Sequence, residues 1–318
     1  MDESFAPRDL IERETLRDLC TRRDLPSVHR LAVHVGAIGC VTLWLASAAR
    51  TPWSASGGVV VLAALLAAQF APFHECTHRT AFASRRANEI GAWLCGSLWL
   101  FAPAIYRVFH FEHHRHTQDP ARDPELGGQL DVHGVWPRSL AGWLKLVPVH
   151  LLAMKLDVMW RCAWLPVTRW RGFASWASAE DQAACTRDAR IALGLWTGVL
   201  VMALIGVAGA RPFIIAAVLS HSFIGLWLPC EHRGLPDDGN IFARTRTTAT
   251  NAWVRFWIWN MNYHAEHHAW PAIPWHRLPA AHALARPHLE HHVRGYLAMH
   301  ANVLTGRNRP TCDAPIER

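Results

Sequence analysis

The sequence predicts an all-α integral membrane protein, with about four transmembrane helices in two hairpins and a cytoplasmic helical cap that carries clustered histidines. Three observations predict this fold. Hydrophobic residues make up 51% of the 318 residues, charged residues only 18%, and 17 residues are tryptophan, a composition too apolar for an ordinary soluble domain. Several apolar runs are long enough to cross a bilayer. The chain also holds 21 histidines, many of them grouped beside these runs.

The predicted spans come in two pairs along the chain. They cover residues 30–49, 57–73, 191–209 and 212–230. A short turn joins the members of each pair, so that each pair forms a hairpin. Residues 1–30, 79–140 and 232–318 are rich in arginine, whereas the two turns are not. The positive-inside rule therefore places both termini and the long central loop on the cytoplasmic side.

Two further apolar stretches are not predicted to span. Residues 90–106 have basic residues on both flanks, which favours a re-entrant or interfacial segment. Residues 139–160 include Lys145 and Lys155, the only lysines of the chain, and this pattern suits a helix in the headgroup plane.

One domain is expected over residues 30–295, preceded by a cytoplasmic segment, 1–29, and followed by a tail, 296–318. The formal charge of +7 is explained by a basic face against anionic lipid. Nucleic-acid binding is not expected, because the arginines are scattered between apolar runs and no groove-reading motif is present. The eight cysteines form no CxxC pair and are predicted to be free thiols.

Three histidine clusters share a helical spacing. They are HECTH with His74 and His78, HFEHH with His110, His113 and His114, and HAEHH with His264, His267 and His268. Positions i, i+3 and i+4 lie on one face of a helix, so the side chains of each cluster converge. Eight imidazoles exceed what one metal ion accepts, and two ions are therefore predicted.

Histidines outside these clusters have different expected roles. His232 follows the fourth span as His74 follows the second, and it is a candidate ninth ligand. His221 lies inside the fourth span, where we expect it to form a hydrogen bond between helices. The HLEHH stretch, 288–292, repeats the HxxHH spacing, but it is interpreted as an exposed or interfacial C-terminal helix without metal.

Carboxylates accompany the clusters. Ligating histidines usually donate their second N–H to a carboxylate or carbonyl, which orients the ring. The candidates for this supporting role are Glu75, Glu112, Glu231, Glu266 and Asp119, and Asp123 is a further carboxylate close to the second cluster.

The order, spacing and flanks of these clusters resemble the three histidine boxes, HxxxH, HxxHH and HxxHH, of the membrane fatty acid desaturase and hydroxylase superfamily. HECTH, HFEHHRHTQDP and NYHAEHHAWPAIPWHRLP carry the resemblance, which covers roughly residues 30–295. It implies two iron ions on the cytoplasmic side, O₂ as co-substrate and a lipid or acyl substrate. No CxxC or HPGG motif is present for a fused electron carrier, so a separate ferredoxin or cytochrome b5 with its reductase is implied.

The predicted reaction is desaturation of an acyl chain. A hydroxylase, a carotenoid ketolase and a terminal-olefin-forming decarboxylase share the same boxes and remain alternatives. A histidine-rich membrane metal transporter or metal-binding sensor is the alternative from another class. A transporter would hold its ligands within the spans, and of the candidate histidines named above only His221 lies there.

Overall fold

The computed structural model describes residues 10–47, 51–125, 136 and 149–305. The chain divides into two compact units, each assembled from segments far apart in the sequence. Unit 1 comprises Met1–Arg23, Glu112–Leu144 and Leu226–Arg318, and unit 2 comprises Asp24–Phe111 and Lys145–Gly225. Helices α6 and α10 each continue from one unit into the other.

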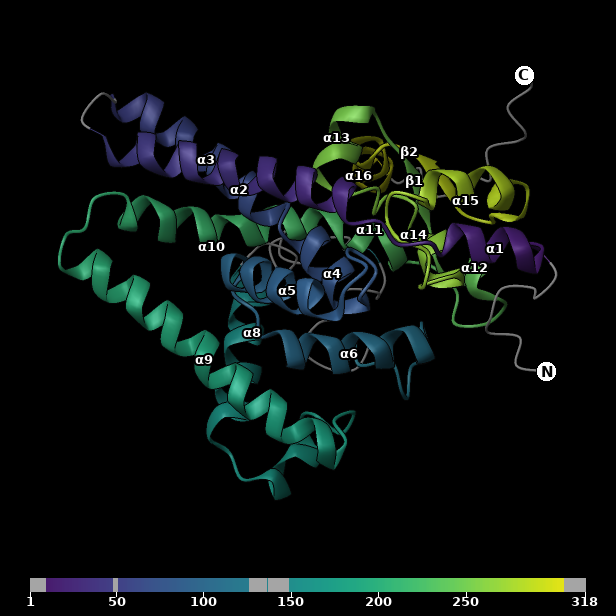
Figure 1. Cartoon of the computed structure of the whole chain (residues 1–318), viewed down its shortest axis with the longest axis horizontal. Coiled ribbons are helices and arrows are strands. Elements are labelled where there is room, and N and C mark those ends of the chain that lie inside the picture. The colour runs from purple at the N-terminus through teal and green to yellow at the C-terminus, as the bar shows by residue number, and fades with distance from the viewer. Residues whose placement is uncertain (1–9, 48–50, 126–135, 137–148, 306–318) are drawn as a thin grey trace. The chain divides into compact units, whose positions relative to one another are not determined.

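Unit 2 is helical throughout its described part (Figure 1). Its elements are α2 (Asp24–Ala46), α3 (Pro52–Ala67), α4 (Phe70–His78), α5 (Arg85–Trp99), most of α6 (Pro103–His116), α8 (Val149–Trp164), the 3₁₀ helix η1 (Val167–Gly172), α9 (Ala179–Leu204) and most of α10 (Ala210–Trp227). Helices α2 and α3 form the first hairpin, whereas α9 and α10 diverge from the turn that joins them (Figure 1).

Three stretches of the described chain are long and apolar enough to cross a membrane. They are Arg13–Ala46, Pro52–His78 and Ala210–His232. They contain most of the predicted span 30–49 and all of the spans 57–73 and 212–230. The prediction of an all-α membrane fold is therefore confirmed.

The predicted span 191–209 differs from the structure. Helix α9 ends at Leu204, and the turn that follows holds Gly206 and Gly209 at positive φ angles of 82° and 85°. The apolar part of α9 begins only after Arg190, so it is shorter than the roughly 20 residues of a full crossing. A fourth crossing exists if α5 and α6 count as one span, and these two helices meet at a bend of 96°. This bend lies in the stretch 90–106, for which a re-entrant or interfacial segment was predicted.

Local sequence signals explain where the helices around this bend begin and end. Ser84 caps the first turn of α5 by accepting a hydrogen bond from the Ala87 N–H. Helix α5 ends at Trp99, because the next residue, Leu100, has a left-handed φ of 59°. Helix α4 ends in the same way at His78, since Arg79 has a φ of 60°.

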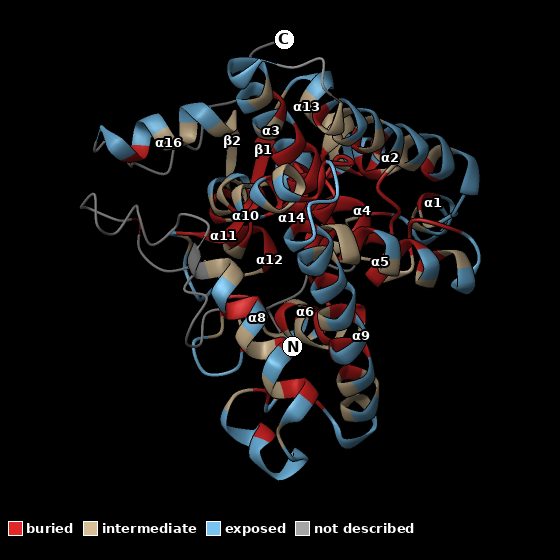
Figure 2. Ribbon diagram, turned by 90° about the vertical axis from the view of Figure 1, so that its left-hand side faces the viewer, coloured by how far each residue is buried: buried red, intermediate tan, exposed pale blue. Residues whose placement is uncertain are grey.

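An aromatic core fills unit 2 between α4, α5 and α6. The Trp99 ring lies 4.9 Å from the Phe70 ring and 5.8 Å from the Phe73 ring, and Tyr106 lies 4.8 Å from Phe73. Buried residues dominate α4, whereas α2 and α9 expose much of their surface (Figure 2). The exposed residues of α2 and α9 include large apolar side chains, as expected for a surface covered by lipid.

Unit 1 consists of short elements. They are α1 (Arg13–Leu19), α11 (Pro229–His232), α12 (Ile241–Arg244), β1 (Thr247–Ala249), α13 (Ala252–Trp257), α14 (His264–Ala269), α15 (Leu278–Ala285), η2 (Arg286–His288), β2 (His292–Arg294) and α16 (Tyr296–Leu304). Strands β1 and β2 pair in parallel, with Thr247 opposite His292. The helix expected over 288–292 is absent, because η2 ends at His288 and the chain then enters β2.

The apolar stretch 139–160 falls partly outside the described residues. Its described part lies in α8. The seven cysteines in the described ranges are free thiols, as predicted.

Candidate metal centre

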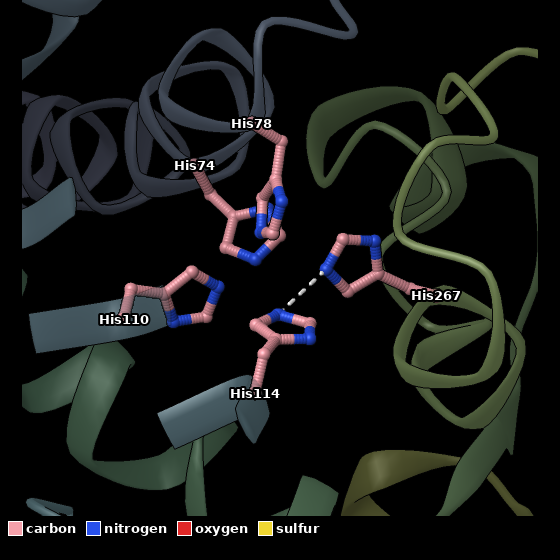
Figure 3. Close-up of side chains that lie close together, drawn as sticks. All are labelled: His74, His78, His110, His114 and His267. Atoms are coloured by element: carbon pink, nitrogen blue, oxygen red, sulfur yellow. Dashed lines mark hydrogen bonds between the residues drawn. The ribbon is translucent and has the colours of Figure 1, made fainter. Parts of the chain in front are cut away.

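Unit 2 brings three of the predicted histidines together. His74 and His78 lie one turn apart on α4, and His110 lies on α6. The ring of His110 is 4.4 Å from the ring of His74 and 4.9 Å from that of His78. One ring nitrogen of each lies within 4.8 Å of those of the other two. The three side chains converge in Figure 3.

Two of these three rings, His74 and His110, are buried among aromatic side chains, whereas His78 is half-buried. His74 is fully buried and His110 is 3% exposed. Tyr106 stacks on the His110 ring at 4.9 Å, and Phe70 lies 5.8 Å from the His74 ring. These aromatic side chains shield His74 and His110 from water.

A second group of three histidines lies wholly within unit 1. His113 comes from α6, His232 from α11 and His268 from α14. Their ring centroids are separated by 4.7–5.0 Å, and one ring nitrogen of each lies within 4.8 Å of the other two. All three side chains are buried. The structure therefore places His232 beside two box histidines.

The Nδ1 atom of each ring in this second group has a hydrogen-bond partner. His113 Nδ1 lies 3.0 Å from both carboxylate oxygens of Asp123, and His232 Nδ1 lies 3.1 Å from the carbonyl oxygen of Arg244. A carboxylate and a backbone carbonyl both accept hydrogen bonds, so the Nδ1 atoms of His113 and His232 carry the proton.

The third ring follows the same rule. His268 Nδ1 lies 3.2 Å from Thr117 Oγ1, and this hydroxyl donates its own proton to the carbonyl oxygen of His113 at 2.8 Å. Thr117 therefore accepts from His268 Nδ1–H. In a neutral ring Nε2 then carries no proton, and its lone pair is available to bind a metal ion. His268 Nε2 is buried, and no hydrogen-bond partner for it lies in the described part of the chain.

This arrangement fits a bound metal ion. Protein metal sites use neutral imidazoles whose second nitrogen donates to a carboxylate, carbonyl or hydroxyl group. Burial lowers the pKa of His268 well below its ordinary value, and the neighbouring His114, His264, His232 and His113 lower it further. The ring is thus held neutral, which is the form that binds metal.

The remaining box histidines also lie in unit 1. His264 Nε2 is 2.7 Å from His232 Nε2. His267 Nε2 is 3.2 Å from His114 Nε2, as the dashed line in Figure 3 shows. The His114 ring stacks on that of His268 at 4.0 Å. Every box histidine therefore has another one close by within its own unit.

The carboxylates named from the sequence take different positions. Glu75 is buried with Oε1 3.8 Å from His74 Nδ1, and Glu231 is buried with Oε2 3.6 Å from His264 Nδ1. Glu112 pairs with Arg115 and lies 3.6 Å from His116.

The other two named carboxylates contact no box histidine in the described structure. Glu266 is buried, accepts a hydrogen bond of 2.5 Å from Thr247 Oγ1 and pairs with His282. Asp119 binds Arg122 and accepts from the Ala121 N–H in a turn.

Asp123 holds the position in which Asp119 was expected. It is 2% exposed and accepts from His113, from the Gln118 N–H at 2.8 Å and from the Glu125 N–H at 2.9 Å. The sequence indicated Asp123 as a carboxylate close to the second cluster, but it did not indicate Thr117. Neither residue follows a helical spacing from its histidine partner, so only the folding of the loop after α6 brings them into contact.

Two further buried residues, His221 of α10 and Arg246, have structural partners. His221 Nε2 lies 3.1 Å from Lys155 Nζ on α8, which confirms the predicted hydrogen bond between helices. Arg246 is 6% exposed and donates to the carbonyl oxygens of Cys230 and Arg233. It thereby fixes α11, which carries His232.

The chain is similar in sequence to known proteins. The family model described as fatty acid desaturase matches residues 50–300. The chain is 27% identical over 259 residues to a β-carotene ketolase of Paracoccus sp., an alignment that covers 79% of this chain and 86% of that protein.

Two other relatives are matched over a smaller part of their length. A zeaxanthin 4-ketolase of Chlamydomonas reinhardtii is 26% identical, with 74% of this chain and 46% of that protein covered. A sphingolipid delta(4)-desaturase/C4-monooxygenase of Homo sapiens is 26% identical, with 69% of this chain and 61% of that protein covered. The family model matches well over half of the sequence, and the chain therefore belongs to the fatty acid desaturase family.

Proposed function

We propose that this protein is a membrane-bound, O₂-dependent oxidoreductase that desaturates an acyl chain, using two iron ions held by histidines and electrons from a separate donor. Family membership and the apolar helices make it an integral membrane oxidoreductase of the desaturase or oxygenase type. The observation that carries the metal assignment is the set of three buried rings in unit 1 whose Nδ1 atoms are all engaged.

The proposed ligands are the nine histidines named from the sequence. His113, His232 and His268 would hold one ion, and His74, His78 and His110 supply ligands for the other. His114, His264 and His267 complete the set. Of the carboxylates, we propose that Asp123 supports His113, that Glu75 supports His74 and that Glu231 supports His264.

Bound iron would supply, with O₂ and two electrons, the oxidising power that an unactivated C–H bond requires. The chain's own residues hold the metal and protect the site. Asp123, Thr117 and the Arg244 carbonyl orient three rings, so that little reorganisation is needed when an ion binds. The aromatic side chains around His74 and His110 keep water away from the reacting region.

The electron donor is proposed to be a ferredoxin or cytochrome b5 with its reductase. The termini and the active site are proposed to lie on the cytoplasmic side, within a single membrane domain over 30–295.

Carotenoid ketolation is the second candidate reaction. It is favoured by the alignment with the Paracoccus β-carotene ketolase, which extends over 86% of that protein. Both reactions begin with removal of hydrogen from an aliphatic carbon, so the same histidine geometry is suited to both.

Expression in a host that contains β-carotene, fatty acyl lipids and both kinds of electron donor tests the two candidates together. Lipids and pigments are extracted and analysed by mass spectrometry, with His113→Ala as the inactive control. Loss of two hydrogens from an acyl chain supports desaturation, whereas a carbonyl oxygen in place of two hydrogens on the carotenoid supports ketolation. An unchanged lipid and pigment profile, with zinc as the bound metal, would refute both.

A further inference from the structure

Lys155 is a buried lysine on α8 within unit 2. It is 1% exposed, and Nζ lies 2.6 Å from the carbonyl oxygen of Trp99 and 3.1 Å from Nε2 of His221. The same nitrogen lies 3.4 Å from the centre of the Trp99 ring. No carboxylate within the described ranges pairs with it, and burial lowers the pKa of the amine well below its ordinary value.

The direction of these hydrogen bonds follows from His221. Its Nδ1 lies 2.8 Å from the carbonyl oxygen of Ala217, which can only accept, so Nδ1 carries the proton. Nε2 of the neutral ring is therefore an acceptor, and Lys155 donates to it. A lysine amine has at least two N–H groups in either protonation state, enough for both His221 and the Trp99 carbonyl.

Trp99 is the last residue of α5, immediately before the 96° bend. The last four carbonyls of a helix lack partners within the helix and must find them elsewhere. Lys155 supplies a donor for the Trp99 carbonyl, and the indole Nε1 of Trp196 on α9 donates to the Ser97 carbonyl at 2.8 Å. Side chains from α8 and α9 thus satisfy the end of α5.

The other side of the bend is held by α9 as well. The Ala104 N–H, in the first turn of α6, donates to Oδ2 of Asp188 at 3.1 Å. Asp188 is 3% exposed. A carboxylate at a helix N-terminus also interacts favourably with the helix dipole. Residues 97–104, here called the elbow, are therefore fixed on both sides by three side chains from α8 and α9.

Small changes at the elbow have large effects at the histidines. His114 lies ten residues beyond Ala104 on α6, which corresponds to about 15 Å of helix. A change of about 10° in the direction of α6 would move His114 by about 3 Å over that length. Metal ligands must be placed within about 0.2 Å of their ideal distances. The direction of α6 therefore has to be held closely for any metal site that uses its histidines.

We propose that Lys155, Asp188 and Trp196 are positioning residues that clamp the elbow and thereby fix where α6 presents His110, His113 and His114. The inference rests on the proposed function, because it assigns these histidines to the metal centre. The aromatic contacts support it, since Trp99 lies against Tyr106 at 6.3 Å and Tyr106 stacks on His110.

The test uses the full-length protein with Lys155→Met, which keeps the length of the side chain and removes its hydrogen-bond donors. Arg190→Met is the matched control. Arg190 donates to the Ala163 carbonyl, so this substitution removes a cation between α8 and α9 without touching the elbow. Asp188→Asn, which keeps an acceptor for the Ala104 N–H, is compared with Asp188→Ala.

Two readouts are measured besides turnover. Iron affinity and the Mössbauer spectrum report on the metal centre. Spin labels on unnatural amino acids at Ile90 of α5 and Arg115 of α6, which are both exposed, report the distance across the elbow and leave the native cysteines untouched. Lys155→Met and Asp188→Ala should broaden the distance distribution and lower iron affinity by about 10–100-fold. Arg190→Met and Asp188→Asn should stay close to the wild type.

Wild-type distances and wild-type iron affinity in Lys155→Met would overturn the clamp. If Lys155→Met does not fold, Asp188→Ala decides by the same criteria. If the wild-type protein holds no coupled iron pair, the proposed function fails. In that case the spin-label distances alone still decide whether the clamp exists.

Discussion

Replacing Asp123 by Asn tests the metal assignment most directly, because the substitution keeps the size of the side chain and removes its charge. The carboxylate accepts from His113 Nδ1 through both oxygens, and each oxygen accepts one further backbone N–H, from Gln118 or Glu125. An asparagine amide can take the place of only one of these oxygens as an acceptor. Its NH₂ group would face a backbone N–H, donor against donor.

The expected magnitude follows from this geometry. Loss of a partner that orients a metal-bound histidine typically lowers metal affinity by about 10–100-fold, or about 1.4–2.7 kcal/mol. The backbone N–H left without an acceptor should lower the free energy of unfolding by about 1–3 kcal/mol. Asp123→Asn should therefore weaken iron binding even at temperatures at which the variant is still folded.

The assay is competition for Fe²⁺ between purified protein and a chromophoric chelator, without oxygen. Asp119→Asn is the matched control, since this residue lies in the same loop but binds Arg122 and contacts no box histidine in the described structure. We expect the control to retain wild-type affinity. The reasoning would be refuted if Asp123→Asn retained it too, or if both variants lost affinity equally.

Three further predictions concern single side chains. Thr117→Val should lower iron affinity by about tenfold, because His268 Nδ1 loses its acceptor, whereas Thr117→Ser should not; equal affinity in both variants would contradict this. Glu266→Gln should lower the free energy of unfolding by about 1–2 kcal/mol, measured as a lower melting temperature, because Glu266 bonds Thr247 and His282. The iron content of this variant should stay unchanged. Gly91→Ala should destabilise the protein by about 1–3 kcal/mol in thermal unfolding, because the new methyl group would lie 2.6 Å from a cysteine sulfur of α4. Gly39→Ala, with no atom within 4 Å, should stabilise α2 slightly, and a shared sign for the two glycine variants would refute the packing argument.

The membrane class and the grouping of histidines were predictable because they depend on local properties of the chain. Apolar length decides whether a segment can cross lipid, and the spacing i, i+3, i+4 places His110, His113 and His114 on one helical face whatever the rest of the molecule does. The span over 191–209 was harder to predict. Composition does not reveal that α9 ends at Leu204, where a glycine-containing turn takes over.

The sequence named several supporting carboxylates but did not decide which of them orients which ring. Asp119 and Asp123 stand in the same short loop with the same chemistry, and only the folded path of that loop directs Asp123 to His113 and Asp119 to Arg122. Lys155 gave no sign of its contact with Trp99 and His221, which lie 56 and 66 residues away in the chain. The sequence by itself determined which segments are long and apolar and which imidazoles share a helical face, because these properties follow from neighbours within one or two turns. Only the tertiary structure decided which rings meet and which groups orient them, because those contacts join segments whose separation in the chain carries no periodic signal.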